Sequence, residues 1–175
     1  MRITRHEWAM GIAQLTAGRS TCLRRSVGCV LLDQDGFILA TGVNGVASGM
    51  PHCNEVTKLL PSTMSTPEGD RPIPGSKGNH EYGHACPGAR AASGTQLDGC
   101  HAIHAEQNAL LRCGDIRRIY AAYCTASPCM TCVKLLMNTG CQQIFYLEEY
   151  PHPDAMNLWL TSGGDREWIQ MELPE

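Results

Sequence analysis

Residues 118–147, RIYAAYCTASPCMTCVKLLMNTGCQQIFYL, carry the pattern that decides the expected fold. Their apolar runs predict a strand over 118–124, a helix over 129–138 and a second strand over 143–147. A further helix is expected just upstream, over 104–112. Strands and helices that alternate with short connections are typical of a layered α/β domain with a largely parallel sheet.

The N-terminal part of the chain adds a helix and a β-hairpin. Thr4 and Glu7 have the spacing of a capping box, which predicts a helix over roughly residues 4–17. An apolar strand is expected over 27–32, and the turn residues of 33–36 lead into a second apolar run. The hairpin is therefore expected to open the sheet with an antiparallel pair.

The chain has 175 residues, a length that fits one domain with an insertion better than two full domains. Residues 46–99 are dominated by Gly, Pro, Ser, Thr, His and Asn, and so long a loop inside a compact domain is usually functional or disordered. We expect residues 1–175 to form a single domain with a Gly/Pro-rich insertion at about 46–99. A weaker helical pattern follows over 154–160.

Charge and hydropathy exclude several classes of protein. With 14 Lys and Arg against 17 Asp and Glu, the net charge of -3 offers no basic field for nucleic acid, and 10 aromatic residues are too few for a stacking platform. No apolar run approaches the roughly 18 residues that span a bilayer, and the N-terminus lacks the apolar core of a signal peptide. We expect a soluble, unexported, cytoplasmic protein with no nucleic-acid or membrane partner.

Four residues at the starts of two predicted helices point to a metal centre. Cys129 and Cys132 present two sulfurs to one point, and the positive end of a helix favours their thiolate forms. With His104 they make three ligands, which leaves the fourth tetrahedral position for water, as in catalytic zinc sites. Glu106 is better placed as a proton carrier beside that water than as a ligand.

Each half of this motif alone is weak evidence for a catalytic zinc site. A C-x-x-C pair also occurs as a redox pair or as half of a structural zinc site. The combination H-x-E followed by P-C-x-x-C is far more specific, because it is the known signature of zinc-dependent nucleobase deaminases.

The sequence thereby resembles the cytidine deaminase-like, zinc-dependent superfamily, and within it the deoxycytidylate (dCMP) deaminases. The matching pieces are VGCV (27–30), TGVNG (41–45), PHC (51–53), CHAIHAEQNAL (100–110), SPCMTC (127–132), IFY (144–146) and EY (149–150). The resemblance implies a three-layer α/β/α fold with a mixed sheet opened by an antiparallel hairpin.

The resemblance also implies an activity. Members hydrolyse dCMP to dUMP, which supplies dTTP synthesis, and many are hexamers that dCTP activates and dTTP inhibits. Zinc would lower the pKa of its water, and Glu106 would take a proton from that water and return protons to the pyrimidine N3 and the leaving amine. The competing hypotheses are a deaminase of another nucleotide or nucleoside, such as dCTP or deoxycytidine, and a non-catalytic zinc module.

Several residues are expected at the nucleotide on the same grounds. Asn44 resembles the family asparagine that hydrogen-bonds the sugar, and an Asn-Gly turn is the alternative interpretation. Ala105 and the loop of Thr125, Ala126 and Ser127 would contact the base. Tyr150 resembles a tyrosine at the pocket mouth, and a plain aromatic residue at a strand end fits it equally well.

The remaining cysteines suggest a second, structural zinc. Cys22, Cys53, Cys86 and Cys100 lie in or beside predicted loops, and Cys22 and Cys53 fall on positions that resemble ligands in related deaminases with long insertions. The competing ligands are His52, His84 and His101, and the alternative is a set of free thiols. By contrast, Cys29, Cys124 and Cys141 are expected in strands as buried apolar residues.

An anionic nucleotide needs local positive charge on an acidic chain. The candidates for the substrate phosphate are Arg112, Arg117 and Arg118, near the end of the helix over 104–112. The candidates for a triphosphate effector are Arg24, Arg25, Lys58 and Lys77. For each of them, surface solvation is the alternative.

Overall fold

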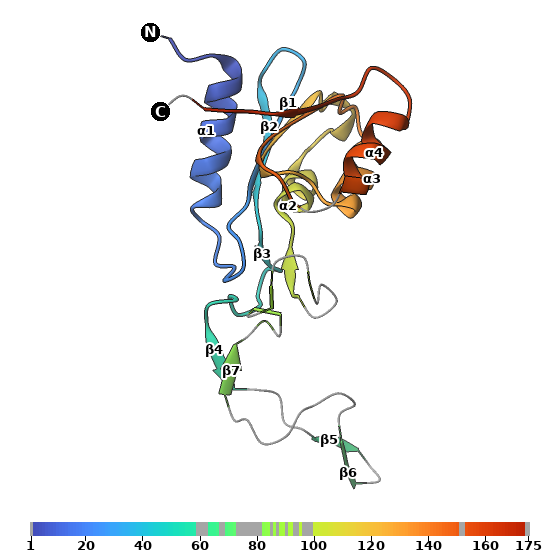
Figure 1. Ribbon diagram of the computed structural model, residues 1–175. Coiled ribbons are helices and arrows are strands. Elements are labelled where there is room, and N and C mark those ends of the chain that lie inside the picture. The colour runs from blue at the N-terminus through green and yellow to red at the C-terminus, as the bar shows by residue number, and fades with distance from the viewer. Residues whose placement is uncertain are drawn as a thin grey trace.

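A five-stranded mixed sheet forms the centre of the protein (Figure 1). The computed structural model describes residues 2–58, 63–66, 69–72, 82–84, 86, 88–89, 91–92, 95, 100–150 and 153–173. The strands are ordered β11 (Glu167–Gln170), β10 (Gln143–Glu148), β9 (Ala121–Ala126), β1 (Gly28–Leu32) and β2 (Ile38–Val43). The last three strands in chain order are parallel, and β1 is antiparallel to both β2 and β9. The predicted mixed sheet opened by a hairpin is confirmed.

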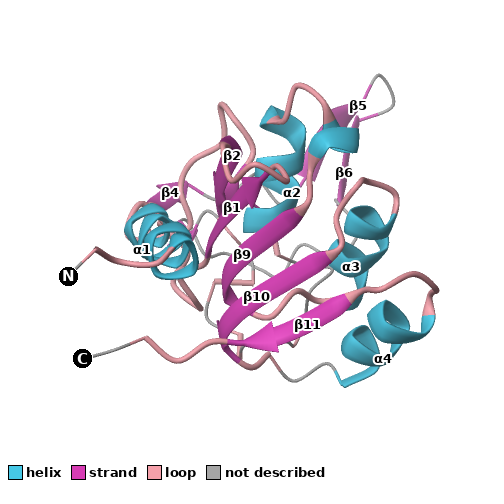
Figure 2. Ribbon diagram, turned by 90° about the horizontal axis from the view of Figure 1, so that it is seen from above, coloured by secondary structure: helices cyan, strands magenta, loops and turns pink. Residues whose placement is uncertain are grey.

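Helices cover both faces of this sheet (Figure 2). One face packs against α1 (Arg5–Ala17), and the other packs against α2 (Ala105–Arg112), α3 (Met130–Met137) and α4 (Pro153–Thr161). Strand β1 shows how one strand serves both faces, because Val30 and Leu32 point into the core beneath α1 while Cys29 and Leu31 point into the opposite core. The expected three-layer α/β/α architecture is confirmed. Among the described residues, no helix has the length and apolarity needed to cross a membrane.

Local signals set the start of α1 and the hairpin turn as expected. Thr4 Oγ1 accepts a hydrogen bond from the Glu7 backbone N–H, and the Glu7 carboxylate accepts one from the Thr4 N–H at 2.6 Å, which completes the capping box. In the turn, Asp33 accepts hydrogen bonds from the backbone of Phe37 and Gly36, with Gly36 at a φ of 90°.

Three features differ from the expectation. Strand β9 begins at Ala121 instead of Arg118, because Ile116–Arg118 form a 3₁₀ turn (η2) that the Asp115 side chain caps. Strand β11 was not predicted from the sequence. Cys141, expected in a strand, is buried in the connection before β10.

The segment between β2 and α2 leaves the sheet through a short ladder. Strands β3 (Gly45–Val46) and β8 (Ala102–Ile103) pair at its base, and β4 (Val56–Lys58) pairs with β7 (Tyr82–His84). A third pair joins β5 (Thr63–Thr66) and β6 (Gly69–Pro72), farther from the five-stranded sheet (Figure 1). Lys77 lies outside the described residues.

Two glycines allow helices to pack directly on the hairpin. A Cβ atom at Gly42 would overlap the Ala105 carbonyl oxygen and the Ala109 backbone nitrogen of α2. A Cβ atom at Gly28 would overlap the Ala13 carbonyl oxygen of α1 in the same way. The absence of a side chain at Gly42 therefore fixes how closely α2, and His104 just before it, approaches the sheet.

We predict that Gly42→Ala destabilises the protein by about 1–3 kcal/mol, because the added methyl group pushes α2 from β2. Thermal unfolding measured beside bound-zinc content tests this, and both should fall together. Gly11→Ala is the matched control: a Cβ atom there has no neighbour within 4 Å, and replacing a glycine inside a helix stabilises by roughly 0.5–1 kcal/mol. Wild-type stability for Gly42→Ala would contradict the packing argument.

Candidate active site

The candidate site lies at one end of the strands of the five-stranded sheet, where β9 and β2 end and α2 and α3 begin. The carboxyl end of β9 runs through Ser127 and Pro128 into α3, and Cys129 is the residue immediately before that helix. Strand β2 ends at Val43, directly opposite the start of β1 at Gly28, so Asn44 reaches the same edge. The Asn108 side chain donates a hydrogen bond to the Val43 carbonyl at 2.8 Å and so anchors α2 to this point. Two helix N-termini therefore face each other across the end of the sheet.

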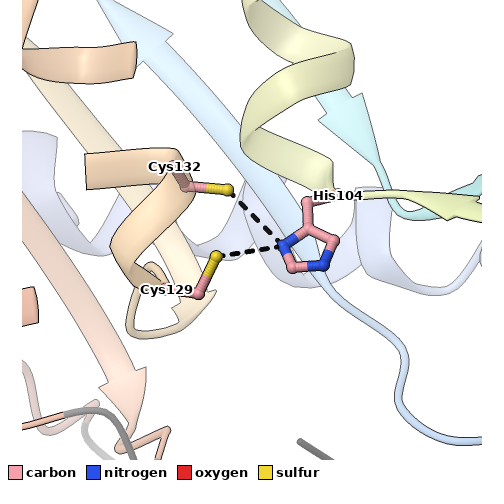
Figure 3. A group of neighbouring side chains, drawn as sticks. All are labelled: His104, Cys129 and Cys132. Atoms are coloured by element: carbon pink, nitrogen blue, oxygen red, sulfur yellow. Dashed lines mark hydrogen bonds between the residues drawn. The ribbon is translucent and has the colours of Figure 1, made fainter. Parts of the chain in front are cut away.

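His104, Cys129 and Cys132 converge in the way expected for a metal centre (Figure 3). The His104 Nδ1 atom lies 3.5 Å from the sulfur of Cys129 and 3.5 Å from that of Cys132. A tetrahedral zinc ion with ordinary Zn–N and Zn–S lengths requires about 3.5 Å between nitrogen and sulfur. All three ligand atoms lie within 4.8 Å of one another, so these side chains fit a zinc ion without rearrangement.

The electrostatics of the two thiols favour metal binding. The hydrogen bond from the Cys132 thiol lowers the pKa of Cys129 to about 3, assisted by His104 and by the Cys132 backbone N–H. The same shared proton, together with burial, raises the pKa of Cys132. The hydrogen bond to Cys129 raises the pKa of His104. The Cys129 thiol therefore loses its proton more readily than a free cysteine, and a divalent cation would replace the protons that the members of the cluster share.

Glu106 is placed beside this cluster rather than in it. It lies in the first turn of α2 with only 3 % of its surface exposed. Burial raises the pKa of its carboxyl group, and the group interacts with the Cys132 side chain. A carboxyl group with a raised pKa can both accept and donate a proton near neutral pH, which is the property required of a proton carrier.

A pocket of about 600 Å³ opens onto the cluster. Five of the six residues expected to contact a nucleotide line it, namely Asn44, Ala105, Ala126, Ser127 and Tyr150. Thr125 does not line it, and its hydroxyl accepts a hydrogen bond from the Gly28 N–H at 3.1 Å. Sequence reasoning did not place Cys22, Arg24, Arg25, Val27, Cys100 and Ala102 in this wall.

The Asn44 side chain holds the loop before β1 in place, which the sequence did not indicate. Its side-chain oxygen accepts hydrogen bonds from Ser20 Oγ at 2.7 Å and from the Val27 N–H at 2.8 Å, and its amide donates to the Arg25 carbonyl at 2.7 Å. These bonds hold the 20–27 segment against the pocket. That segment has no helical or strand pattern, so no sequence signal predicts where it lies.

The four other loop cysteines gather beside the pocket. Cys53 and Cys86 are buried and Cys100 packs against them. Burial and the neighbouring Cys86 and Cys22 thiols raise the pKa of Cys53 to about 12. Burial of Cys86 is outweighed by hydrogen bonds from the His101 and Gly88 backbone N–H groups, which lower its pKa. Within the described residues, however, only the ligand atoms of the His104 cluster all lie within 4.8 Å of one another.

The competing histidines are less well placed. His52 Nδ1 is hydrogen-bonded to Thr21 Oγ1 at 3.1 Å, and the His101 side chain is exposed. His84 lies in β7. Cys29 and Cys124 are buried in paired strands with their sulfurs 3.7 Å apart, in the positions expected.

The candidate phosphate-binding arginines divide into two groups. Arg112, at the far end of α2, donates to the Asn108 carbonyl, and Arg118 pairs with Asp33 at 2.7 Å. Neither these two nor Arg117 lines the pocket of this chain. Arg24 and Arg25, assigned from the sequence to a triphosphate effector, line the pocket that contains Glu106.

Comparison with known proteins agrees with this geometry. The chain is 34 % identical over 145 residues to the deoxycytidylate deaminase of Schizosaccharomyces pombe, covering 81 % of this chain but only 36 % of that protein, so it spans about a third of the length of this relative. It is 32 % identical over 144 residues to the deoxycytidylate deaminase of Mycobacterium phage D29, with 82 % and 94 % covered.

A solved structure and a family model give the same result. The crystal structure of dCMP deaminase from the cyanophage S-TIM5 in complex with dCMP and dUMP superposes with a TM-score of 0.64 at 26 % identity, covering 98 % of this chain and 99 % of that one. The model of the cytidine and deoxycytidylate deaminase zinc-binding region matches residues 3–148. That match includes both helix starts and the three side chains that could hold a metal ion, and the chain therefore belongs to the cytidine and deoxycytidylate deaminase family.

Proposed function

We propose that this protein is a zinc-dependent hydrolase that deaminates dCMP to dUMP. The observation that carries the proposal is a buried carboxyl group, Glu106, beside three side chains that fit a zinc ion, at the base of an open pocket. The phage relative of similar length is named a deoxycytidylate deaminase, and the cyanophage structure contains dCMP and dUMP. The product would feed the supply of dTTP.

Each residue of the site has a distinct task in this reaction. A zinc ion held by His104, Cys129 and Cys132 supplies Lewis acidity and lowers the pKa of a bound water. The Glu106 carboxylate would accept the two protons of the attacking water in turn, as the water oxygen bonds to C4. It would deliver one proton to N3 of the pyrimidine and the other to the amine, which leaves C4 as ammonia. Ala105, Ala126 and Ser127 line the pocket and would orient the base. Asn44 and Tyr150 also line it and would contact the sugar and form the pocket mouth.

The position of Glu106 argues against a purely structural metal module. A structural zinc has four protein ligands and gains nothing from a buried carboxyl group that is not a ligand. Other substrates, such as dCTP and deoxycytidine, remain the alternative within the same reaction class, and direct assays of all three compounds distinguish them.

We predict that Glu106→Gln lowers kcat for dCMP by about 10³-fold or more, because proton transfer is lost while the three metal ligands remain. Loss of pyrimidine absorbance measures the rate, and elemental analysis should show unchanged catalytic zinc. Glu172→Gln, an exposed change near the C-terminal end of the chain, serves as the matched control. Activity of Glu106→Gln within about tenfold of wild type would refute its assigned role.

We further propose a second, structural zinc bound by Cys22, Cys53, Cys86 and Cys100. Its support is the gathering of these thiols and the two N–H donors at Cys86, since hydrogen bonds of this kind stabilise the thiolate that a metal requires. A closed four-ligand site would tie the insertion at about 46–99 to the rest of a single domain of residues 1–175.

Elemental analysis should then give two zinc ions per chain. Cys53→Ser should remove one ion and increase proteolysis of the insertion, because the closed site is broken, whereas Cys113→Ser, at a partly buried cysteine outside the group, should keep both. A single zinc in the wild-type protein would return Cys22, Cys53, Cys86 and Cys100 to the free-thiol interpretation.

We also propose that the enzyme is a hexamer activated by dCTP and inhibited by dTTP. Exposed apolar side chains could pack between subunits in such a hexamer. Examples are Leu15 on α1 and Phe37 in the hairpin.

The expected result is sigmoidal dCMP kinetics that become hyperbolic with dCTP, because an effector that prefers one state of the oligomer shifts its equilibrium. Steady-state assays with each triphosphate and light scattering for mass test this. A monomer with hyperbolic kinetics insensitive to both compounds would refute the regulatory proposal and leave the zinc chemistry intact.

A further inference from the structure

We propose that Ser20 is a positioning residue, which holds the side chain of Asn44 so that it offers a single N–H group to the sugar of the substrate. The inference rests on the proposed function, because it concerns a nucleotide in the catalytic pocket. It goes beyond that function by giving a task to a residue that does not itself line the pocket.

Most of the hydrogen-bonding capacity of the Asn44 side chain is used within the protein. An amide oxygen can accept two hydrogen bonds, and Oδ1 accepts one from Ser20 Oγ at 2.7 Å and one from the Val27 N–H at 2.8 Å. An amide nitrogen can donate two hydrogen bonds, and Nδ2 donates one to the Arg25 carbonyl at 2.7 Å. No described residue accepts a hydrogen bond from the second N–H, so this group is what Asn44 can offer to a ligand.

The backbone of the loop before β1 decides which way round the amide lies. The Val27 N–H faces Oδ1, and the Arg25 carbonyl oxygen faces Nδ2. A reversed amide would place two donors together at Val27 and two acceptors together at Arg25, which the network excludes. These contacts occupy one of the two acceptor positions of Oδ1, and the Ser20 hydroxyl group occupies the other.

The Ser20 hydroxyl group also restricts how the Asn44 side chain can rotate. Its oxygen lies 3.0 Å from the backbone carbonyl oxygen of Asn44, in addition to the contact with Oδ1. The same hydroxyl accepts a hydrogen bond from the Cys22 N–H at 3.2 Å, which holds it in the loop. One hydroxyl group therefore binds a side-chain oxygen and a backbone oxygen of the same residue. A side chain that is held before the ligand arrives loses less freedom on binding, which favours affinity.

The sugar of the proposed substrate has an acceptor suited to this N–H group. Asn44 is buried, with 9 % of its surface exposed, and it lines the pocket. The deoxyribose of dCMP carries one free hydroxyl group, on C3′, because C2′ has none and C5′ carries the phosphate. The oxygen of that hydroxyl group can accept the Asn44 N–H. The ring oxygen is the other acceptor of the sugar, and a ligand without the hydroxyl group distinguishes the two.

The test compares two nucleotides that differ only by the hydroxyl group on C3′. Calorimetry on the zinc-loaded full chain measures the affinities of dUMP and of 2′,3′-dideoxyuridine monophosphate, and parallel assays measure kcat and KM for dCMP. The variants are Ser20→Ala, which removes the hydroxyl group of the side chain, and Ser20→Thr, which keeps it. Thr21→Ala is the matched control, because it removes a hydroxyl group from the next residue, where it is hydrogen-bonded to His52.

We expect Ser20→Ala to weaken dUMP binding and to raise KM for dCMP by about 3- to 10-fold, with kcat within about twofold of wild type. Its affinity for the dideoxy nucleotide should be unchanged, because that ligand has no hydroxyl group for Asn44 to bind. Ser20→Thr and Thr21→Ala should match wild type with both ligands. In an Asn44→Ala background, Ser20→Ala should have no further effect on dUMP binding, because the two residues act as a unit.

Zinc content and thermal unfolding show whether each variant is folded. Should Asn44→Ala fail to fold, the comparison of the two ligands in Ser20→Ala and Ser20→Thr carries the test alone.

Several results would overturn the inference. Equal losses for dUMP and the dideoxy nucleotide in Ser20→Ala would show that Ser20 only stabilises the loop, and so would an equal loss in Thr21→Ala. Unchanged dUMP affinity in Ser20→Ala, or a wild-type protein that binds both nucleotides equally, would also refute it. Failure of the proposed function is distinguishable, because a protein that gives the expected binding pattern but never deaminates dCMP would refute the reaction and support the role of Ser20.

Discussion

The direct packing of α2 on β2 at Gly42 is the contact on which the site depends. Because no side chain separates the helix from the strand, the start of α2 is held at the end of the sheet, and His104 lies just before it. Strand β9 leads into α3 at the same edge, so its two cysteines face the imidazole. The metal centre therefore belongs to the body of the fold, where packing errors of a few tenths of an ångström are costly.

Local patterns were sufficient to predict most of this fold. The capping box at Thr4, the turn at Gly36 and the alternation of strands and helices all depend on residues close in sequence. Strand β11 was missed because it has four residues at the sheet edge and only its two central side chains are partly buried. The start of β9 was misplaced because Ile116–Arg118 form a 3₁₀ turn that the Asp115 side chain caps, and Arg118 at its end pairs with Asp33, 85 residues earlier.

The same difference between local patterns and contacts distant in sequence explains which residues of the site could be predicted. Two short motifs at the starts of helices were sufficient to predict the side chains that converge at the site, namely His104, Glu106, Cys129 and Cys132. The place of Arg24 in the pocket wall was not predicted, because it depends on the carbonyl groups of Ala92 and Thr95 and on the Asn44 contacts, all distant in sequence. Thr125, expected at the base, does not line the pocket, and its hydrogen bond with Gly28 joins residues 97 positions apart, which no local pattern encodes.

The insertion therefore contributes directly to the surroundings of the pocket. It contributes the carbonyl groups that orient Arg24, and two of the four gathered cysteines, Cys22 and Cys100, lie in the same pocket wall. Two parts of the chain consequently contribute to the surroundings of the pocket: the end of the sheet, which carries the His104 cluster, and the insertion, whose carbonyl groups orient Arg24. Among the described residues of the insertion, the buried apolar cluster consists of Cys53, Cys86 and Ala89. Because this cluster is small, whatever holds it in place also sets how firmly the guanidinium group of Arg24 is oriented.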